Sequence, residues 1–228
     1  MRSPDPNLNI WEHSAALREL YARRADGLAE EMDASAQAAE LLAPFIRAAS
    51  APPRLLDAGC GSGYLWHSFR RRGLAVEYYG LDYSPGLIEI GRRLLPAHGV
   101  AAERLILGRL EDLHGRPLEA AALINTLTFC PDFREPLDRL AESGLKALVI
   151  RDNFGDHTQI RWETDGWLDS GWNHLRGYWN QWSRAEVTAF LEERGFTVAP
   201  VEDARTRGRP EMVVGKPYSW SWLTAFRD

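Results

Sequence analysis

Cysteine is scarce in this sequence. Only two cysteines occur among 228 residues, and Cys60 lies between two glycines, where a disulfide would obstruct any ligand that approaches the loop. With Cys130 as the second, the pattern is typical of a reduced protein, and we expect a cytoplasmic location. Long apolar runs are missing too: the first residues lack a signal-peptide core, and no uncharged apolar stretch approaches the ~20 residues of a membrane helix. We therefore expect no membrane association.

Positive charge is not in excess either. Lysine and arginine number 27 against 32 aspartates and glutamates, which gives a formal net charge of -5. Proteins that bind nucleic acid usually carry a strongly basic face, so this balance argues against nucleic acid as a partner. We also predict no metal site.

The chain does contain enough apolar material for a core, with 45% hydrophobic residues and nine tryptophans. Residues 11–49 follow a helical rhythm of Ala, Leu, Glu and Arg, which predicts two helices separated near Gly27 or Asp33. Pro52 and Pro53 end this segment, because proline lacks an N–H donor and restricts the residue before it. We expect an N-terminal helical segment over residues 1–50 and the main domain over residues 51–228.

Beyond Pro53, short apolar runs alternate with amphipathic helical patterns, which is typical of βα units in a parallel sheet. We predict strands at residues 55–58, 76–81, 105–107, 121–125, 147–151 and 196–201, and a weak last strand at 211–214. Helices are predicted at residues 64–72, 85–95 and 133–143, and between Ser183 and Gly195, where Ser183 and Glu186 form a capping-box pattern.

The stretch of residues 153–182 is rich in aromatic side chains. It is too aromatic for a plain linker and too polar for a core strand, so we interpret it as an insertion after the fifth strand. Its aromatic residues are Phe154, Trp162, Trp167, Trp172, Tyr178, Trp179 and Trp182.

The strongest signal is a glycine loop between a strand and a helix. Gly59, Gly61 and Gly63 follow Asp57 at the end of the first predicted strand. Glycines let the backbone turn sharply and approach a ligand without a Cβ in the way. The second predicted strand leads into Asp82, where a carboxylate can accept both hydroxyl hydrogens of a ribose.

These residues resemble the class I S-adenosylmethionine-dependent methyltransferases, whose first motif has the form acid-x-Gly-x-Gly-x-Gly. The resemblance implies a doubly wound α/β fold with a mostly parallel seven-stranded sheet, Rossmann-like, with the N-terminal helices covering the site. It implies S-adenosylmethionine as cofactor, held by the loop with Asp57, Gly59, Cys60 and Gly61. A nicotinamide dehydrogenase is the other nucleotide-binding candidate, but its fingerprint has Gly or Ala where this chain has Tyr64.

The resemblance implies further cofactor contacts. Tyr83 occupies the position that faces the adenine, and Asn125 the position near the methionine moiety. The family usually has an aspartate where this chain has Arg109, which leaves the backbone N–H of Leu110 as the adenine contact, with Glu111 or Asp112 as substitutes for the aspartate. Tyr21 resembles an N-terminal aromatic residue that closes over the cofactor in some small-molecule members.

The acceptor side is less determined by the sequence. Methyl transfer from a sulfonium requires alignment and exclusion of water, and a neutral amine needs no base, whereas a hydroxyl or a carbon acid does. His157 and His174 are candidate bases, and Trp162 and Trp172 are candidate walls for a small-molecule acceptor, since cations bind well over indole rings. Two alternatives remain: the aromatic residues form only an accessory core, or the protein binds S-adenosylmethionine or S-adenosylhomocysteine without catalysis.

Overall fold

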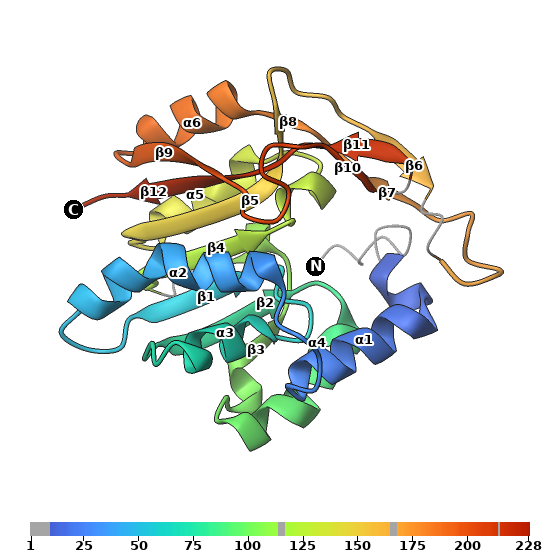
Figure 1. Cartoon of the computed structure of the whole chain (residues 1–228), viewed down its shortest axis with the longest axis horizontal. Helices are drawn as coiled ribbons and strands as arrows, with labels where there is room; N and C mark the ends of the chain where they lie inside the picture. The colour runs from blue at the N-terminus through green and yellow to red at the C-terminus, as the bar shows by residue number, and fades with distance from the viewer. Residues whose placement is uncertain (1–9, 114–116, 165–167, 214) are drawn as a thin grey trace.

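The computed structural model describes residues 10–113, 117–164, 168–213 and 215–228 (Figure 1). Trp167 and Val214, which the sequence analysis included in the aromatic segment and in the last predicted strand, lie outside these residues. None of the helices in the described ranges is long and apolar enough to cross a membrane.

Helices and strands alternate along most of the chain. The α-helices are α1 (Ala15–Ala25), α2 (Asp33–Ala48), α3 (Leu65–Arg71), α4 (Pro85–Leu94), α5 (Arg134–Glu142) and α6 (Arg184–Glu192). Short 3-10 turns include η2 (Ile10–His13), η5 (Leu110–Asp112) and η6 (Leu127–Phe129). The strands are β1 (Arg54–Ala58), β2 (Glu77–Asp82), β3 (Leu105–Leu107), β4 (Ala120–Ile124), β5 (Ala147–Gly155), β6 (Trp162–Thr164), β7 (Arg176–Tyr178), β8 (Trp182–Ser183), β9 (Thr197–Glu202), β10 (Glu211–Val213), β11 (Lys216–Tyr218) and β12 (Trp220–Phe226).

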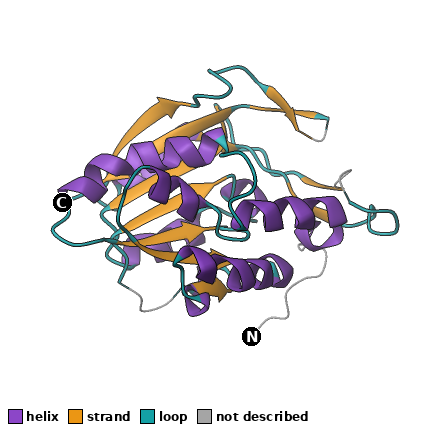
Figure 2. Ribbon diagram, turned by 60° about the horizontal axis from the view of Figure 1, so that its bottom comes forward, coloured by secondary structure: helices purple, strands orange, loops and turns teal. Residues whose placement is uncertain are grey.

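The main sheet is mostly parallel and has helices on both faces (Figure 2). Its strand order is β3-β2-β1-β4-β5-β12-β9, and the short strand β8 pairs with the end of β5. The first five strands in this order run parallel, while β12 is antiparallel to both of its neighbours. This is the doubly wound α/β fold that the sequence predicted.

Two apolar clusters fill the two faces of the sheet. Helices α2, α3 and α4 contribute to one cluster, and α5 and α6 contribute to the other. Neighbouring residues of one strand enter opposite clusters, as Leu55 and Leu56 of β1 do, because successive side chains of a strand point to opposite faces. The loops that follow the carboxyl ends of the parallel strands are therefore held on a rigid, two-sided core.

The two N-terminal helices and the first five strands are confirmed, with ends that shift by up to four residues. The strand predicted at residues 211–214 is present as β10 (Glu211–Val213), but it is not the last strand of the main sheet. Residues Glu211–Val213 pair with β11 in a separate hairpin, and the strand that completes the sheet is β12, at the C-terminus. Strand β12 has no polar alternation that would predict it from the sequence, because both of its faces are buried, with Trp222 in one cluster and Leu223 in the other.

The aromatic segment is not a single element. Asn153 and Phe154 extend β5, Trp182 begins β8, and β6 and β7 pair as a small antiparallel ribbon. A third apolar cluster lies here, formed by Leu168, Leu175 and Trp179 together with Tyr218 and Trp220, and partly buried Trp11, Phe129 and Val213 pack against it. The insertion thus packs against both ends of the chain.

Candidate functional site

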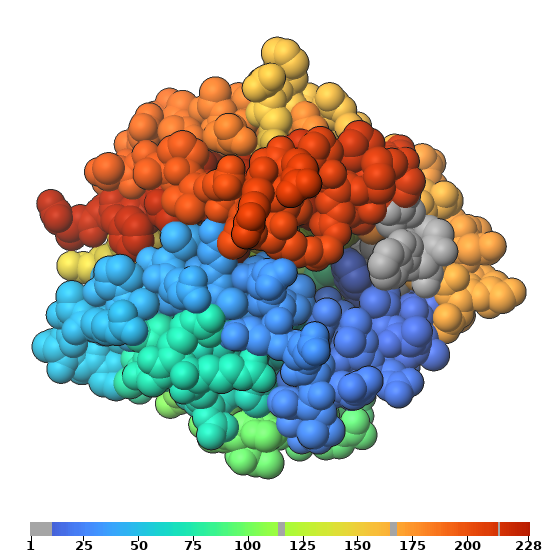
Figure 3. All heavy atoms as spheres, viewed as in Figure 1, coloured from blue at the N-terminus to red at the C-terminus, as the bar shows by residue number. Residues whose placement is uncertain are grey.

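A cavity of about 250 Å³ lies at the carboxyl ends of the parallel strands. Residues from the N-terminal segment, the glycine loop, the loops after β2, β3 and β4, and the C-terminal strands line it. Figure 3 shows the N-terminal elements, in blue, lying next to the orange and red residues of the C-terminal third on one face of the molecule. Hydrogen bonds join the two at Gln37, which contacts the backbone of Glu202 and Ala204.

The glycine loop follows β1 and forms the floor of the cavity, with Gly59 and Gly61 in its lining. Both glycines have positive φ angles, 78° and 55°, a region that other residues rarely adopt. A Cβ on Gly61 would lie 2.4 Å from Cε1 of Tyr21, and one on Gly59 would lie 2.4 Å from Oγ1 of Thr126. The loop therefore needs glycine both for its backbone and for the close approach of neighbouring groups.

Asp82 stands beside this loop at the end of β2. Its Oδ2 accepts a hydrogen bond from the Gly61 amide at 2.7 Å, and its Oδ1 accepts one from the Ser84 amide at 2.9 Å. Burial raises the pKa of Asp82 to about 6, although the amides oppose this shift. A carboxylate has about four lone-pair sites, so the two oxygens retain capacity to accept the hydroxyl hydrogens of a ribose.

Asp57 lies behind the loop and Cys60 within it, and neither residue lines the cavity. Asp57 is buried, and its Oδ2 accepts a hydrogen bond from the Tyr78 hydroxyl at 2.6 Å. Burial raises the pKa of Asp57 to about 7 and raises the pKa of the Cys60 thiol well above its usual range. In this structure Asp57 supports β1 and β2 beneath the loop.

Tyr21 of α1 covers the glycine loop. The backbone carbonyl of Tyr21 accepts a hydrogen bond from Ser62 Oγ at 2.8 Å, which fixes α1 to the loop. The Arg24 guanidinium lies 5.4 Å from the ring centre of Tyr21 and 5.2 Å from that of Tyr64. Tyr64 lines the cavity at the start of α3, where a dinucleotide-binding fold would leave room for a pyrophosphate.

The far end of the cavity is formed by residues after β2 and β3. Tyr83, Arg109 and Leu110 line it, and the Arg109 guanidinium lies 5.9 Å from the Tyr83 ring centre. Glu111 lines the cavity as well. This end thus combines a phenol ring with one cation and one carboxylate.

Asn125 and Thr126 follow β4 and lie between the loop and the opposite wall. Asn125 lines the cavity with a φ angle of 56°, a left-handed conformation that asparagine tolerates better than most residues. Thr126 Oγ1 donates a hydrogen bond to the Ala58 carbonyl at 2.8 Å. Thr126 thus fixes the end of β4 against the end of β1.

The opposite wall is aromatic and comes from four separate elements. It consists of Trp11, Phe129, Trp179 and Trp220. The ring centres of Trp11 and Phe129 are 5.2 Å apart, and those of Phe129 and Trp179 are 5.1 Å apart, both with edge-to-face geometry. Sequence reasoning missed this wall, because nothing in a one-dimensional pattern joins Trp11 to Trp220.

The predicted acceptor-side residues lie elsewhere. Trp172 is 45% exposed and stacks on His13, while Trp162 is half-buried against Tyr178. His157 and His174 are exposed, and no histidine in the described ranges lines the cavity. Within the same ranges, no group of three or more His, Cys, Asp or Glu side chains is placed to hold a metal ion.

Comparison with known proteins agrees with this geometry. Residues 55–143 match the family model of a methyltransferase domain. A malonyl-[acyl-carrier protein] O-methyltransferase of Serratia marcescens is 39% identical over 70 residues, which are 31% of this chain and 24% of the relative. A ribosomal RNA small subunit methyltransferase C of Stutzerimonas stutzeri is 38% identical over 76 residues, 33% of this chain and 22% of that protein. The matches therefore span about a quarter of the length of these relatives.

Solved structures extend the likeness to the whole fold. A magnesium protoporphyrin IX methyltransferase from Synechocystis, solved with S-adenosylmethionine, superposes with a TM-score of 0.60 and 17% identity, covering 100% of both chains. A 1,6-didemethyltoxoflavin-N1-methyltransferase from Burkholderia thailandensis gives a TM-score of 0.56 and 20% identity, covering 94% of this chain and 88% of the other. Residues 55–143 thus match a methyltransferase domain, and the fold of the chain is that of solved S-adenosylmethionine-dependent methyltransferases.

Proposed function

We propose that the protein transfers a methyl group from S-adenosylmethionine to a small, largely apolar acceptor. The observation that carries this proposal is the cavity itself, which joins the glycine loop and Asp82 on one side to a wall of Trp11, Phe129, Trp179 and Trp220 on the other.

The cofactor half of the cavity fits the chemical groups of S-adenosylmethionine. Asp82 retains lone pairs for a ribose diol, and Gly59 and Gly61 leave room for close approach. Arg24 lines the cavity near Tyr21 and offers a cation for the cofactor carboxylate. Tyr64 occupies the space that a pyrophosphate would need, which disfavours a dinucleotide.

The chemistry follows from what the residues of the wall can do. S-adenosylmethionine supplies a methyl group on a sulfonium, so the protein has to align the acceptor and exclude water. Four aromatic side chains do both, since they bury an apolar acceptor and leave little space for solvent. The proposed mechanism uses no histidine, because His157 and His174 are exposed and outside the lining. An acceptor that needs no base, such as a neutral amine, fits this arrangement best.

Similar proteins differ in their acceptors. The Synechocystis and Burkholderia thailandensis enzymes act on small molecules, which supports the proposal, whereas the Stutzerimonas stutzeri relative acts on ribosomal RNA. The net charge of -5 favours the small molecule, because phosphate backbones are bound mainly by positive charge.

Calorimetry with three ligands tests the cofactor. We expect micromolar-scale binding of S-adenosylmethionine and S-adenosylhomocysteine and no binding of NAD, because the site has a ribose acceptor and no pyrophosphate cradle. Preferential binding of NAD would refute the proposal.

A second experiment tests the acceptor. The protein is incubated with S-adenosylmethionine and a panel of aromatic and aliphatic amines, phenols and carboxylic acids, with small ribosomal subunits as a separate arm, while formation of S-adenosylhomocysteine is measured. Turnover with a small molecule is the expected result. Turnover only with ribosomal subunits would overturn the small-molecule part, and binding without any turnover would instead indicate a non-catalytic cofactor-binding protein.

A further inference from the structure

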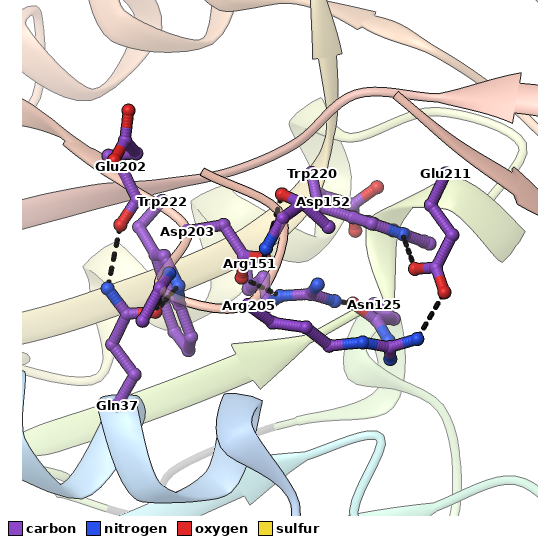
Figure 4. Close-up of polar contacts among 12 residues, drawn as sticks. Gln37, Asn125, Arg151, Asp152, Glu202, Asp203, Arg205, Glu211, Trp220 and Trp222 are labelled. Carbon is purple, nitrogen blue, oxygen red and sulfur yellow. Dashed lines mark hydrogen bonds and ion pairs between the residues drawn. The ribbon is translucent and has the colours of Figure 1, made fainter. Parts of the chain in front are cut away.

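A buried arginine lies directly behind the cavity (Figure 4). Arg151 of β5 is 3% exposed, and its Nε donates to Oδ2 of Asp203 at 2.6 Å. Asp203 is 1% exposed, and its Oδ1 accepts hydrogen bonds from the amide and hydroxyl of Thr206. Burial would raise the pKa of Asp203, but the bond and charge of Arg151 outweigh it and lower that pKa below its usual value. The two charges therefore form a buried ion pair, in which the charge of Arg151 is balanced by that of Asp203.

The pair does not use all the donors of the guanidinium. Nη1 of Arg151 donates to Oδ1 of Asn125 at 2.5 Å, and the backbone carbonyl of Arg151 accepts the Asn125 amide at 2.7 Å. Asn125 is thus held by its side chain and its backbone at once, in a left-handed conformation with φ of 56°. With Oδ1 engaged, its amide NH₂ is the group left to donate to a ligand.

The same guanidinium supports the aromatic wall. Its Cζ lies 4.6 Å from the ring centre of Trp220, and the Trp220 indole N–H donates to Oε2 of Glu211 at 3.0 Å. Glu211 also pairs with Arg205. Trp220 is therefore held on its face by Arg151 and on its edge by Glu211 (Figure 4). Arg151 itself is absent from the cavity lining, whereas Asn125 and Trp220 belong to it.

We propose that Arg151 is a positioning residue, whose guanidinium holds Asn125 on the cofactor side of the cavity and Trp220 on the acceptor side. One side chain then fixes the positions of these two residues relative to each other. This inference rests on the proposed function. It follows from geometry, because a planar guanidinium offers several donors in a rigid fork and can serve a carboxylate, an amide oxygen and an aromatic face together, as an ammonium cannot.

The test measures binding of S-adenosylhomocysteine to the full chain by calorimetry, with melting curves for each variant. Arg151→Lys keeps the buried positive charge but removes the planar set of N–H donors of the guanidinium. Asn125→Gly removes the side chain without straining a left-handed backbone, which alanine would do. We expect each variant to bind about tenfold more weakly, since a hydrogen bond of a charged or fixed group is lost.

The double variant separates positioning from stability. If Arg151 acts through Asn125, then Arg151→Lys combined with Asn125→Gly binds no more than about twofold more weakly than the worse single variant. Arg194→Lys is the matched control. Arg194 pairs with Asp138 at 2.5 Å and lies over the ring of Phe190, far from the cavity lining, so its substitution should leave the dissociation constant unchanged.

Three results would overturn the inference. They are unchanged affinity of a folded Arg151→Lys protein, multiplicative losses in the double variant, and equal losses in the Arg194→Lys control. If Arg151→Lys does not fold, Asp203→Asn takes its place, because it frees Nε of Arg151, and unchanged affinity in that variant contradicts the inference as well. If the unsubstituted protein fails to bind S-adenosylhomocysteine, both the proposed function and this inference are refuted. If the unsubstituted protein binds and the Arg151 variant has the same dissociation constant, only the inference is refuted.

Discussion

At the scale of single residues, the proposed contact of Asp82 with the cofactor ribose predicts a dependence of cofactor binding on pH. The ordinary Asp82 pKa of 3.8 is raised to about 6 by burial, so the folded protein takes up a proton there at a higher pH than the unfolded chain does. The carboxylate form is the one that accepts both hydrogens of a ribose diol. Ligand binding and protonation of Asp82 therefore oppose each other.

The expected outcome is a loss of cofactor affinity in mild acid. We expect the dissociation constant of S-adenosylhomocysteine to be constant above pH 7 and to rise about tenfold between pH 7 and 5, because the proton must leave Asp82 before the diol binds. Titrations at four pH values measure it. Asp82→Asn is the control, with weaker binding by about 1–3 kcal/mol and no such pH dependence. An identical pH profile in that variant would assign the effect to another group, such as Asp57.

At the scale of elements, the N-terminal segment covers the cofactor half. Leu17, Tyr21 and Arg24 of α1 line the cavity, and α1 packs against α4, whereas Trp11 of η2 belongs to the aromatic wall. Glu12 fixes the start of this segment, because its Oε1 accepts hydrogen bonds from Ser84 Oγ and the Gly86 amide at 2.5 Å each, at the N-terminus of α4. We expect a ligand beneath Tyr21 to leave faster when this contact opens.

Glu12→Gln should therefore speed release. We expect the dissociation rate of S-adenosylhomocysteine to increase about threefold to tenfold, since a neutral amide caps the α4 N-terminus less well than a carboxylate. Stopped-flow displacement measures the rate. Glu19→Gln, an exposed change on the same α1 helix, should leave it unaltered. Equal rates for all three proteins would show that the segment does not limit release.

The aromatic insertion divides into residues with different environments. Trp179 is 6% exposed and touches Phe129 and Tyr218, whereas Trp172 is 45% exposed. Trp179→Ala should cost about 3–5 kcal/mol of unfolding free energy, as large-to-small core substitutions do. Trp172→Ala should cost less than about 1 kcal/mol, because it removes only a surface stacking contact.

Melting curves and denaturant titrations of the two variants decide this prediction. A milder change, Trp179→Phe, preserves most of the packing and tests the wall directly through turnover of any acceptor found in the screen. Equal destabilisation by the two alanine substitutions would contradict the burial that separates them.

At the scale of the whole molecule, the cavity is assembled from both ends of the chain. Trp11 and Trp220 line one cavity, although they stand more than two hundred positions apart in the sequence.

Ligand binding should therefore stabilise the complete fold. At one hundred times its dissociation constant, S-adenosylhomocysteine should add about 2.7 kcal/mol of unfolding free energy. For a domain of this size, that corresponds to a rise of several degrees in Tm, which differential scanning calorimetry detects. NAD at the same concentration is the control, and an equal rise with NAD would contradict the prediction.

The sequence by itself determined the framework and placed several residues of the proposed cofactor half. Local patterns carried this information, since a strand, a glycine turn and a helix are adjacent in the chain, and the acid of the second strand follows at a spacing set by one βα unit. Gly59, Gly61, Asp82 and Tyr83 line the cavity for that reason. The sequence also showed that Arg109 stands where the methyltransferases it resembles usually have an aspartate.

Only the tertiary structure decided the acceptor half. The residues of the aromatic wall come from η2, η6, the link between β7 and β8, and β12, and no periodicity relates them. Trp162 and Trp172 look equivalent to Trp179 in the sequence, but folding buries only Trp179 against the third cluster. The pairing of Arg151 with Asp203 depends on the insertion of β12 between β5 and β9, whereas its contact with Asn125 depends on the parallel pairing of β4 and β5. Side-chain burial is a property of long-range packing, and for that reason a local pattern predicted where the cofactor half lies but not which aromatic residues face it.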